Sequence, residues 1–171
     1  MIVTYSKGWF RSHRRSVGDL DESTARKLHE KGKLYTVIAG DVDRPLAFIE
    51  VRLEVDYVGV SFLDHLKREL TSFQFSARGL DGETAPAGMC FLQSIIHSEF
   101  DDDGDKAAYG TSYDYYFDGR CEVIRENLRT REILEGRHIF DVSAHWEALP
   151  AFGQYDAFLQ YDRWKHGDVK H

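Results

Sequence analysis

Cysteine, proline and long apolar runs are all scarce in this sequence. It has three prolines and two cysteines among its 171 residues. Two cysteines are too few for the disulfide framework that stabilises many small secreted domains. No apolar run approaches the ~18 residues of a membrane-spanning helix. No positively charged leader precedes an apolar segment either. We therefore expect a cytoplasmic protein with no membrane partner.

Length and composition predict one globular domain. The chain of 171 residues is close to the ~150 residues expected per domain, and 42% hydrophobic, 13% aromatic and 30% charged residues exclude intrinsic disorder. We expect a single domain over 1–171 with three parts. These are a basic N-terminal segment with a short helix (1–33), an antiparallel sheet (34–142) and a C-terminal cover (143–171).

Positive charge is concentrated at the start of the chain. Residues 1–33 hold eight Lys or Arg against four acids, a net +4, so with a total of −7 the remainder carries −11. An acidic body opposes nucleic-acid binding, because neutralising phosphates supplies most of the non-specific affinity there. We therefore expect no nucleic-acid partner.

Local patterns predict a helix near the N-terminus and strands after it. Asp21 is a good N-cap for a helix over 21–31, and Gly32 is a good stop signal. Apolar residues alternate with polar ones over 47–57 and then change parity, which predicts a strand with a bulge or bend near Gly59. Further strands are predicted at 71–77, 89–99, 109–117 and 133–142, with a loop at 78–88.

The succession of strands and polar turns defines the expected fold class. It is mainly β (α+β), an antiparallel meander curved into an open barrel or half-sandwich, with a short N-terminal helix. Residues 150–164 are interpreted as an amphipathic C-terminal helix or an aromatic-rich strap over the sheet.

Hairpin registers place both cysteines in the core. A three-residue loop at 118–120 pairs Phe117 with Cys121, and a connection at 101–106 places Cys90 opposite Phe117 as well. The two thiols would then lie about two strand spacings apart, too far for a disulfide. We predict two reduced, buried and inert cysteines.

The sequence carries no motif for metal binding or nucleophilic catalysis. The acidic tract 101–105 fails the calcium-loop pattern, since its first ligand position is Glu99 and its twelfth is Gly110. Glu50 and Glu54 are predicted to share the polar face of one strand with a basic residue between them, which is typical of a solvent-facing charge ladder. We expect no metal and no cofactor, and binding is favoured over catalysis.

Acidic and aromatic residues are the candidates for binding. The carboxylates of 101–105 and of 50–56 are expected to form a negative patch uninterrupted by the basic segment 1–33. The alternating aromatics of 109–117 are interpreted as filled core, with a cavity for an apolar ligand as the alternative. The full set of candidate binding residues is Asp101, Asp102, Asp103, Asp105, Glu50, Glu54, Trp146, Phe152 and Tyr155.

One segment resembles a known type of protein. Residues 91–119, FLQSIIHSEFDDDGDKAAYGTSYDYYFDG, look like the strand, acidic turn and strand meander of small bacterial proteins, some of them similar to immunity proteins of polymorphic toxin systems. The resemblance covers about a sixth of the chain and assigns no functional residue. It implies a non-catalytic, acidic, cytoplasmic binding protein that neutralises a basic toxin domain. An apolar-ligand-binding protein and an enzyme with a dispersed site stay open as alternatives.

Overall fold

The computed structural model describes residues 1–163, which form one antiparallel sheet and one α-helix. The helix is α1 (Glu22–Glu30). Short 3-10 turns lie at Arg11–His13, Leu53–Val55, Ser143–His145 and Asp156–Leu159. The eleven strands are β1 (Val3–Phe10), β2 (Arg15–Leu20), β3 (Tyr35–Gly40), β4 (Pro45–Arg52), β5 (Tyr57–Leu63), β6 (Glu69–Ser76), β7 (Met89–Glu99), β8 (Tyr109–Tyr115), β9 (Arg120–Asn127), β10 (Ile133–Ile139) and β11 (Trp146–Ala148).

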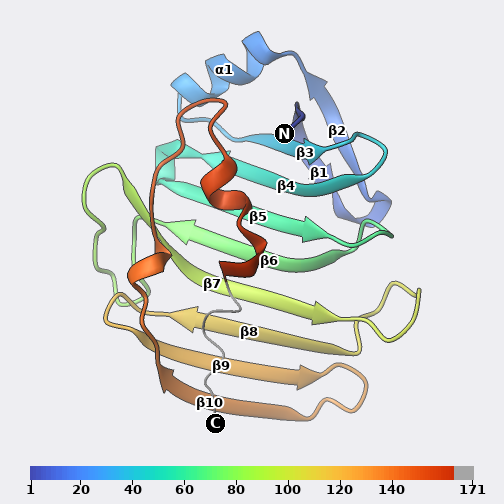
Figure 1. Ribbon diagram of the computed structural model, residues 1–171, viewed down its shortest axis with the longest axis vertical. Coiled ribbons are helices and arrows are strands. Elements are labelled where there is room, and N and C mark those ends of the chain that lie inside the picture. The colour runs from blue at the N-terminus through green and yellow to red at the C-terminus, as the bar shows by residue number, and fades with distance from the viewer. Residues whose placement is uncertain (164–171) are drawn as a thin grey trace.

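The strand order confirms the predicted meander. It runs β10-β9-β8-β7-β6-β5-β4-β3-β1-β2, so each strand from β3 to β9 pairs with the next one in the chain (Figure 1). The sheet is not closed, because β10 and β2 are its two edges. The short strand β11 pairs with the first residues of β7. The fold is therefore mainly β, with α1 as a peripheral helix.

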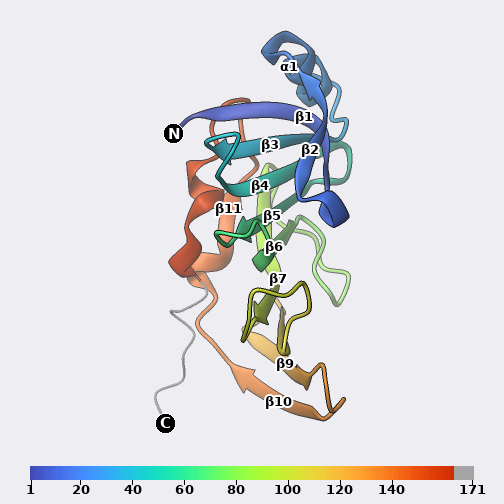
Figure 2. The same ribbon diagram turned by 90° about the vertical axis from the view of Figure 1, so that its right-hand side faces the viewer.

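The C-terminal part covers one face of the sheet. Residues 143–163, called the strap below, run across that face in Figures 1 and 2. Phe158 of the strap meets Phe75 of β6 with 5.0 Å between ring centres, and both are buried. The prediction of an aromatic strap is confirmed, whereas a helix over 150–164 is wrong. Gly153 has φ +84°, a left-handed conformation that interrupts a helix. Trp164 and the rest of the predicted cover lie outside the described residues.

The predicted helix near the N-terminus is confirmed. The Asp21 carboxylate accepts a hydrogen bond from the Thr24 N–H at 2.7 Å, which makes Asp21 the N-cap of α1. Gly32 has φ +68° and directs the chain away from the helix end. The basic segment also forms β1 and β2, which the sequence reading missed. β1 is inserted between β3 and β2, so the sheet starts at Val3 and not at residue 34.

The parity change after residue 57 has a different cause from the one predicted. β4 ends at Arg52, a 3-10 turn covers Leu53–Val55, and β5 begins at Tyr57. Asp56 completes the turn at φ +49°. The apolar parity therefore changes because a hairpin intervenes, and the prediction of one strand with a bulge near Gly59 is wrong.

The two predicted hairpin registers need correction. Glu99 pairs with Tyr109, one residue from the predicted β7–β8 register, so in the second half of β7 Ile95 is buried and Ile96 is exposed, opposite to the prediction. Tyr115 pairs with Cys121, so the β8–β9 register differs by two residues from the predicted one. In β7, Gln93 is an extra residue between the pairs that Ser94 and Leu92 make with β6. After this bulge β11 replaces β8 beside the start of β7, and Cys90 pairs with Glu147 instead of Phe117. Both cysteines are buried in the main core and neither is in a disulfide, as predicted.

Candidate functional site

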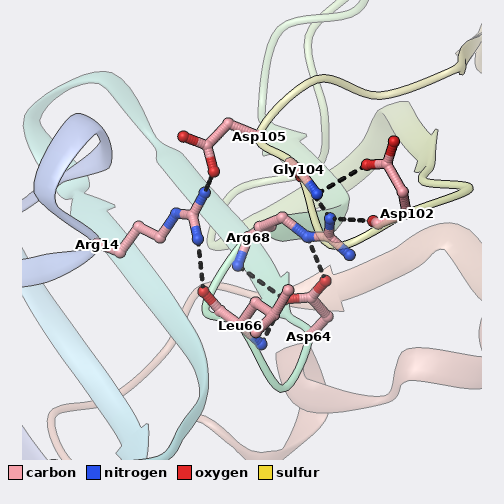
Figure 3. Close-up of polar contacts among 7 residues, drawn as sticks. All are labelled: Arg14, Asp64, Leu66, Arg68, Asp102, Gly104 and Asp105. Carbon is pink, nitrogen blue, oxygen red and sulfur yellow. Dashed lines mark hydrogen bonds and ion pairs between the residues drawn. The ribbon is translucent and has the colours of Figure 1, made fainter.

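The acidic tract forms the connection between β7 and β8. Residues 101–106, called the acidic loop below, are all exposed and lie where β7 ends and β8 begins. The turn between β5 and β6 (64–68) lies beside this loop (Figure 3). Arg68 of that turn donates from Nη1 to the carbonyl oxygens of Asp102 and Gly104, at 2.8 and 2.6 Å. A neighbouring turn therefore holds the main chain of the acidic loop.

Arg68 is almost completely buried, at 8% exposure. Its Nε donates to Oδ2 of Asp64 at 2.7 Å, and its guanidinium carbon lies 3.9 Å from the ring centre of Phe100. A buried charge is costly unless it is paired and hydrogen-bonded, and these contacts provide both. The guanidinium acts as a rigid support under the loop, and the loop carboxylates remain at the surface.

Asp64 organises the turn that carries Arg68. Its Oδ1 accepts hydrogen bonds from the N–H groups of Leu66 and Arg68, each at 2.9 Å. Partial burial disfavours the charged carboxylate, but the main-chain N–H of Arg68, its side chain and the N–H of Leu66 outweigh it and lower the pKa of Asp64. Asp64 is therefore an anion at neutral pH, held in place by three groups of its own turn.

Arg14 connects the N-terminal hairpin to the same place. It lies between β1 and β2 with φ +50°. One guanidinium nitrogen donates to the Leu66 carbonyl oxygen at 3.0 Å, and the other forms an ion pair with Asp105 (Figure 3). Three segments that are distant in the sequence thus meet at the acidic loop.

The four aspartates of the loop are not equivalent. Asp101 receives both Nη groups of Arg129, at 2.8 and 2.7 Å, and Asp105 is paired with Arg14. Asp102 accepts a hydrogen bond from the Gly104 N–H at 2.7 Å. Within residues 1–163, no ion pair engages Asp102 or Asp103. The negative charge that the loop offers to a partner is concentrated on these two residues.

Glu50 and Glu54 are not neighbours on one strand face, contrary to the prediction. Glu50 lies in β4 on the sheet face opposite the strap, 3.4 Å from Nη2 of Arg11. Glu54 lies in the turn after β4 and pairs with Lys33 at 2.6 Å and Arg52 at 2.8 Å. Hydrogen bonds from these two cations lower the pKa of Glu54. The two glutamates therefore do not belong to one site.

The three aromatic candidates belong to the packing of the strap. Trp146 packs on Phe91 with 4.8 Å between ring centres. Phe152 stacks on Tyr5 at 5.1 Å. Tyr155 is 2% exposed, and its hydroxyl lies 3.0 Å from that of Tyr35. These side chains attach the strap to the sheet and are not part of the site around the acidic loop.

The charge division along the sequence is not a division in space. Three basic residues from 1–33 pair with acids of the body. The expectation of a negative patch free of the basic segment is therefore wrong, because the β1–β2 hairpin and the residues after α1 pack onto the rest of the sheet. These ion pairs are Arg11 with Glu50, Arg14 with Asp105, and Lys33 with Glu54.

Within residues 1–163, the reactivity of the two cysteines and of the potential metal ligands depends on their burial and grouping. Burial raises the pKa of both cysteine thiols to about 12, so they are protonated at neutral pH. Burial also lowers the pKa of His145, whose Nδ1 donates to the Leu92 carbonyl oxygen at 2.9 Å. No group of three or more potential metal ligands is found in residues 1–163. No helix in that range is long and apolar enough to cross a membrane.

Sequence reading found the acidic loop but missed the residues that hold it. Arg14, Asp64 and Arg68 were not among the candidates. A local signal existed for the turn, because an aspartate at its first position commonly accepts main-chain N–H groups two or more residues later. Nothing in the sequence indicates that Arg68 contacts carbonyl groups 34 and 36 residues away.

Fold and site together define a class of protein. It is an open antiparallel sheet, covered on one face by a strap, with an acidic loop between β7 and β8 whose main chain is held by Arg68. No protein-family model, curated protein or solved structure is detectably similar to the chain.

Proposed function

We propose that this chain is a non-catalytic acidic binding protein of bacterial type, in which the acidic loop captures a basic protein domain. An immunity protein that neutralises a toxin domain is the member of this class that we favour. The observation that carries the proposal is the buried Arg68, which fixes the main chain of the loop before any partner arrives.

A pre-fixed loop favours binding. Ordering a loop at an interface costs free energy, and a loop that is already ordered avoids that cost. Asp102 and Asp103 then offer two carboxylates that form no ion pair with any residue of 1–163, on a protein of net charge −7. Such charges steer a basic partner and act mainly on the association rate.

The state of the two cysteines agrees with this proposal. Cys90 and Cys121 are free and buried, which is usual for cytoplasmic proteins, where thiols are kept reduced. Their raised pKa also favours a structural role over a nucleophilic one.

The experiment compares two doubly substituted proteins that lose the same charge. Asp102→Asn with Asp103→Asn removes the unpaired carboxylates of the loop. The matched control, Asp19→Asn with Glu30→Gln, removes two exposed carboxylates from β2 and α1. Wild type and both variants are used to capture partners from native lysate, and captured proteins are quantified by mass spectrometry. We expect a basic partner that the wild type and the control retain and the loop variant loses.

Kinetics with the isolated partner complete the test. The association rate should fall about tenfold for the loop variant and should fall with added salt, since the screening length is ~10 Å at 0.1 M. Equal capture by all three proteins, or an association rate insensitive to salt, would contradict the proposal.

A second candidate function rests on a separate cavity. This cavity is lined mainly by apolar side chains and has a volume of about 350 Å³. That volume is at the lower end of the range found for small-molecule pockets. An apolar small molecule that binds there would raise the melting temperature, and Leu70→Trp would abolish that rise by filling the cavity. The lining residues are Met1, Leu46, Ala47, Phe62, Leu63, Leu70, Leu159 and Tyr161.

The aromatic stripe of β8 does not line this cavity. Tyr115 is 3% exposed and meets His145 with 4.4 Å between ring centres, and Phe117 meets Trp146 at 4.7 Å. These rings are filled core, as predicted.

A further inference from the structure

Among the described residues, no strand lies beside the outer edge of β10. Within residues 1–163, β9 is the strand paired with β10, and Figure 1 shows β10 at the end of the sheet. Edge strands are usually protected from further pairing by charged side chains, above all lysine, by proline, by a bulge or by a covering element. The two charges of β10, on Glu135 and Arg137, have opposite signs. β10 (ILEGRHI) contains no lysine or proline and pairs with β9 over seven residues without a register shift. It is a regular template for another strand.

The other edge of the sheet is different. β2 contains Gly18 at φ +70°, a conformation that breaks the regular extended geometry. The two edges are thus not equally suited to pairing, and β10 is the regular one.

The backbone N–H and C=O groups of β10 alternate along the strand between facing β9 and pointing outward. At the two ends of the β9–β10 pairing, the Glu132 carbonyl oxygen and the Phe140 N–H bond to residues on the β9 side, each at 2.9 Å. Backbone groups of successive strand residues point to opposite sides. Even-numbered residues of β10 therefore face β9, and the N–H and C=O groups of 133, 135, 137 and 139 point outward.

Apolar side chains also remain exposed along this edge. Ile133 is 54% exposed, Leu134 71% and Ile139 74%, a concentration of large apolar surface on one strand. Between them, Glu135 and Arg137 lie on the same sheet face as Ile133 and Ile139. The edge therefore combines apolar ends with two opposite charges near its centre.

We propose that β10 pairs antiparallel with β10 of a second copy of this chain, about a two-fold axis at Gly136. This register places Ile133 opposite Ile139 and Glu135 opposite Arg137, and each pair occurs twice by symmetry. Both pairs consist of odd-numbered residues, so the outward N–H and C=O groups of the two copies meet as hydrogen-bonded pairs. A two-fold interface of this kind uses the same surface on both subunits.

The charges of Glu135 and Arg137 favour this register over the two neighbouring symmetric registers. Pairing that uses the outward groups requires odd residues opposite odd residues, so the symmetric alternatives have their axis at residue 135 or 137. Those alternatives set Glu135 against Glu135 or Arg137 against Arg137, and like charges directly opposite are destabilising. With the axis at Gly136, Arg137 lies between Glu122 of its own β9, at 3.6 Å, and Glu135 of the second copy.

The first test is sedimentation of the isolated full chain from about 1 μM to about 1 mM, the range in which weak interfaces dissociate. Glu135→Arg makes the two facing positions Arg and Arg, whereas Arg137→Glu makes them Glu and Glu. Each variant alone should have a dimer dissociation constant at least about tenfold above that of the wild type. An equimolar mixture of the two variants pairs Arg with Glu throughout and should return to within about threefold of the wild type. Glu30→Arg, with the same charge change on α1, should dimerise like the wild type.

Hydrogen exchange gives a second, residue-specific measurement. The amides of Glu135, Arg137 and Ile139 point outward, so their protection should increase with protein concentration. The amides of Gly136 and His138 face β9 and should be protected at every concentration.

Four results would overturn the proposal. They are a wild type that stays monomeric at about 1 mM, a single variant that dimerises as well as the wild type, a mixture that does not recover, and outward amides without protection in the dimer. The measurements use the chain alone, so their outcome is independent of whether the acidic loop binds a partner.

Discussion

Replacing Arg68 by methionine tests whether a buried guanidinium supports the acidic loop. Methionine retains an unbranched apolar stem that can still pack on Phe100 and the main-chain N–H that donates to Asp64, but it removes every side-chain donor that reaches Asp64 and the loop. The variant therefore isolates the polar role of the residue. We expect lower stability together with increased mobility of 101–106.

The structure sets the size of the effect. Removing one partner of a buried ion pair costs about 3–5 kcal/mol, because the other charge stays buried without compensation. The Asp64 side chain is 12% exposed and cannot regain full hydration, whereas the carbonyl groups of Asp102 and Gly104 belong to an exposed loop and can. We therefore expect the lower end of that range, about 3 kcal/mol. For a domain of this size, this corresponds to a melting temperature lower by about 6–12 °C.

The assay is chemical denaturation of wild type, Arg68→Met and a matched control. Arg131→Met removes a guanidinium that is 72% exposed and lies 2.9 Å from Glu126, so it should cost less than about 1 kcal/mol. Adding Asp64→Asn to Arg68→Met removes the uncompensated charge and should recover part of the loss. A stability within about 0.5 kcal/mol of the wild type for Arg68→Met, or an equal loss for Arg131→Met, would refute the reasoning.

Three other predictions follow from the same contacts. The lowered pKa of Asp64 means that its charge stabilises the fold above the unfolded-state value of ~3.9, and that this contribution is lost as the pH falls through the folded-state pKa. Asp64→Asn should flatten the acid side of a stability–pH series, and an unchanged slope would contradict this. A Cβ on Gly59 would collide with the Tyr57 hydroxyl and lie 3.0 Å from Cζ, so Gly59→Ala should cost about 1–2 kcal/mol, and less in a Tyr57→Ala background. In thiol titration Cys90 and Cys121 should both be unreactive in the native protein and both react on unfolding, and a fast-reacting native thiol would contradict their burial.

The sequence by itself determined the local elements and their buried faces. Alternation of apolar and polar residues identified the inward side of 71–75 and of 109–115. Phe73, Phe75 and Tyr115 are in the core, and Tyr113 packs against it. Asp21 and Gly32 defined the helix between them. These properties were readable because they depend on residues within a few positions of one another.

The tertiary structure decided the registers and the strand order. The extra residue Gln93 shifts the pairing of β7 and cannot be recognised from alternation, because both faces near it are apolar or covered. β1 lies between β3 and β2 because the chain returns through α1, which no local pattern indicates. Register follows from turn geometry and from partners elsewhere in the chain.

The tertiary structure also decided which charges are available. The sequence presents residues 101–105 as four equivalent aspartates, but Arg129 and Arg14 neutralise two of them from the β9–β10 and β1–β2 connections, and Arg68 fixes the backbone. The outward phase of the β10 edge was equally hidden, because it depends on which side of that strand β9 occupies. A residue's type and spacing follow from the sequence, whereas its partner depends on chain segments that meet only when the sheet forms.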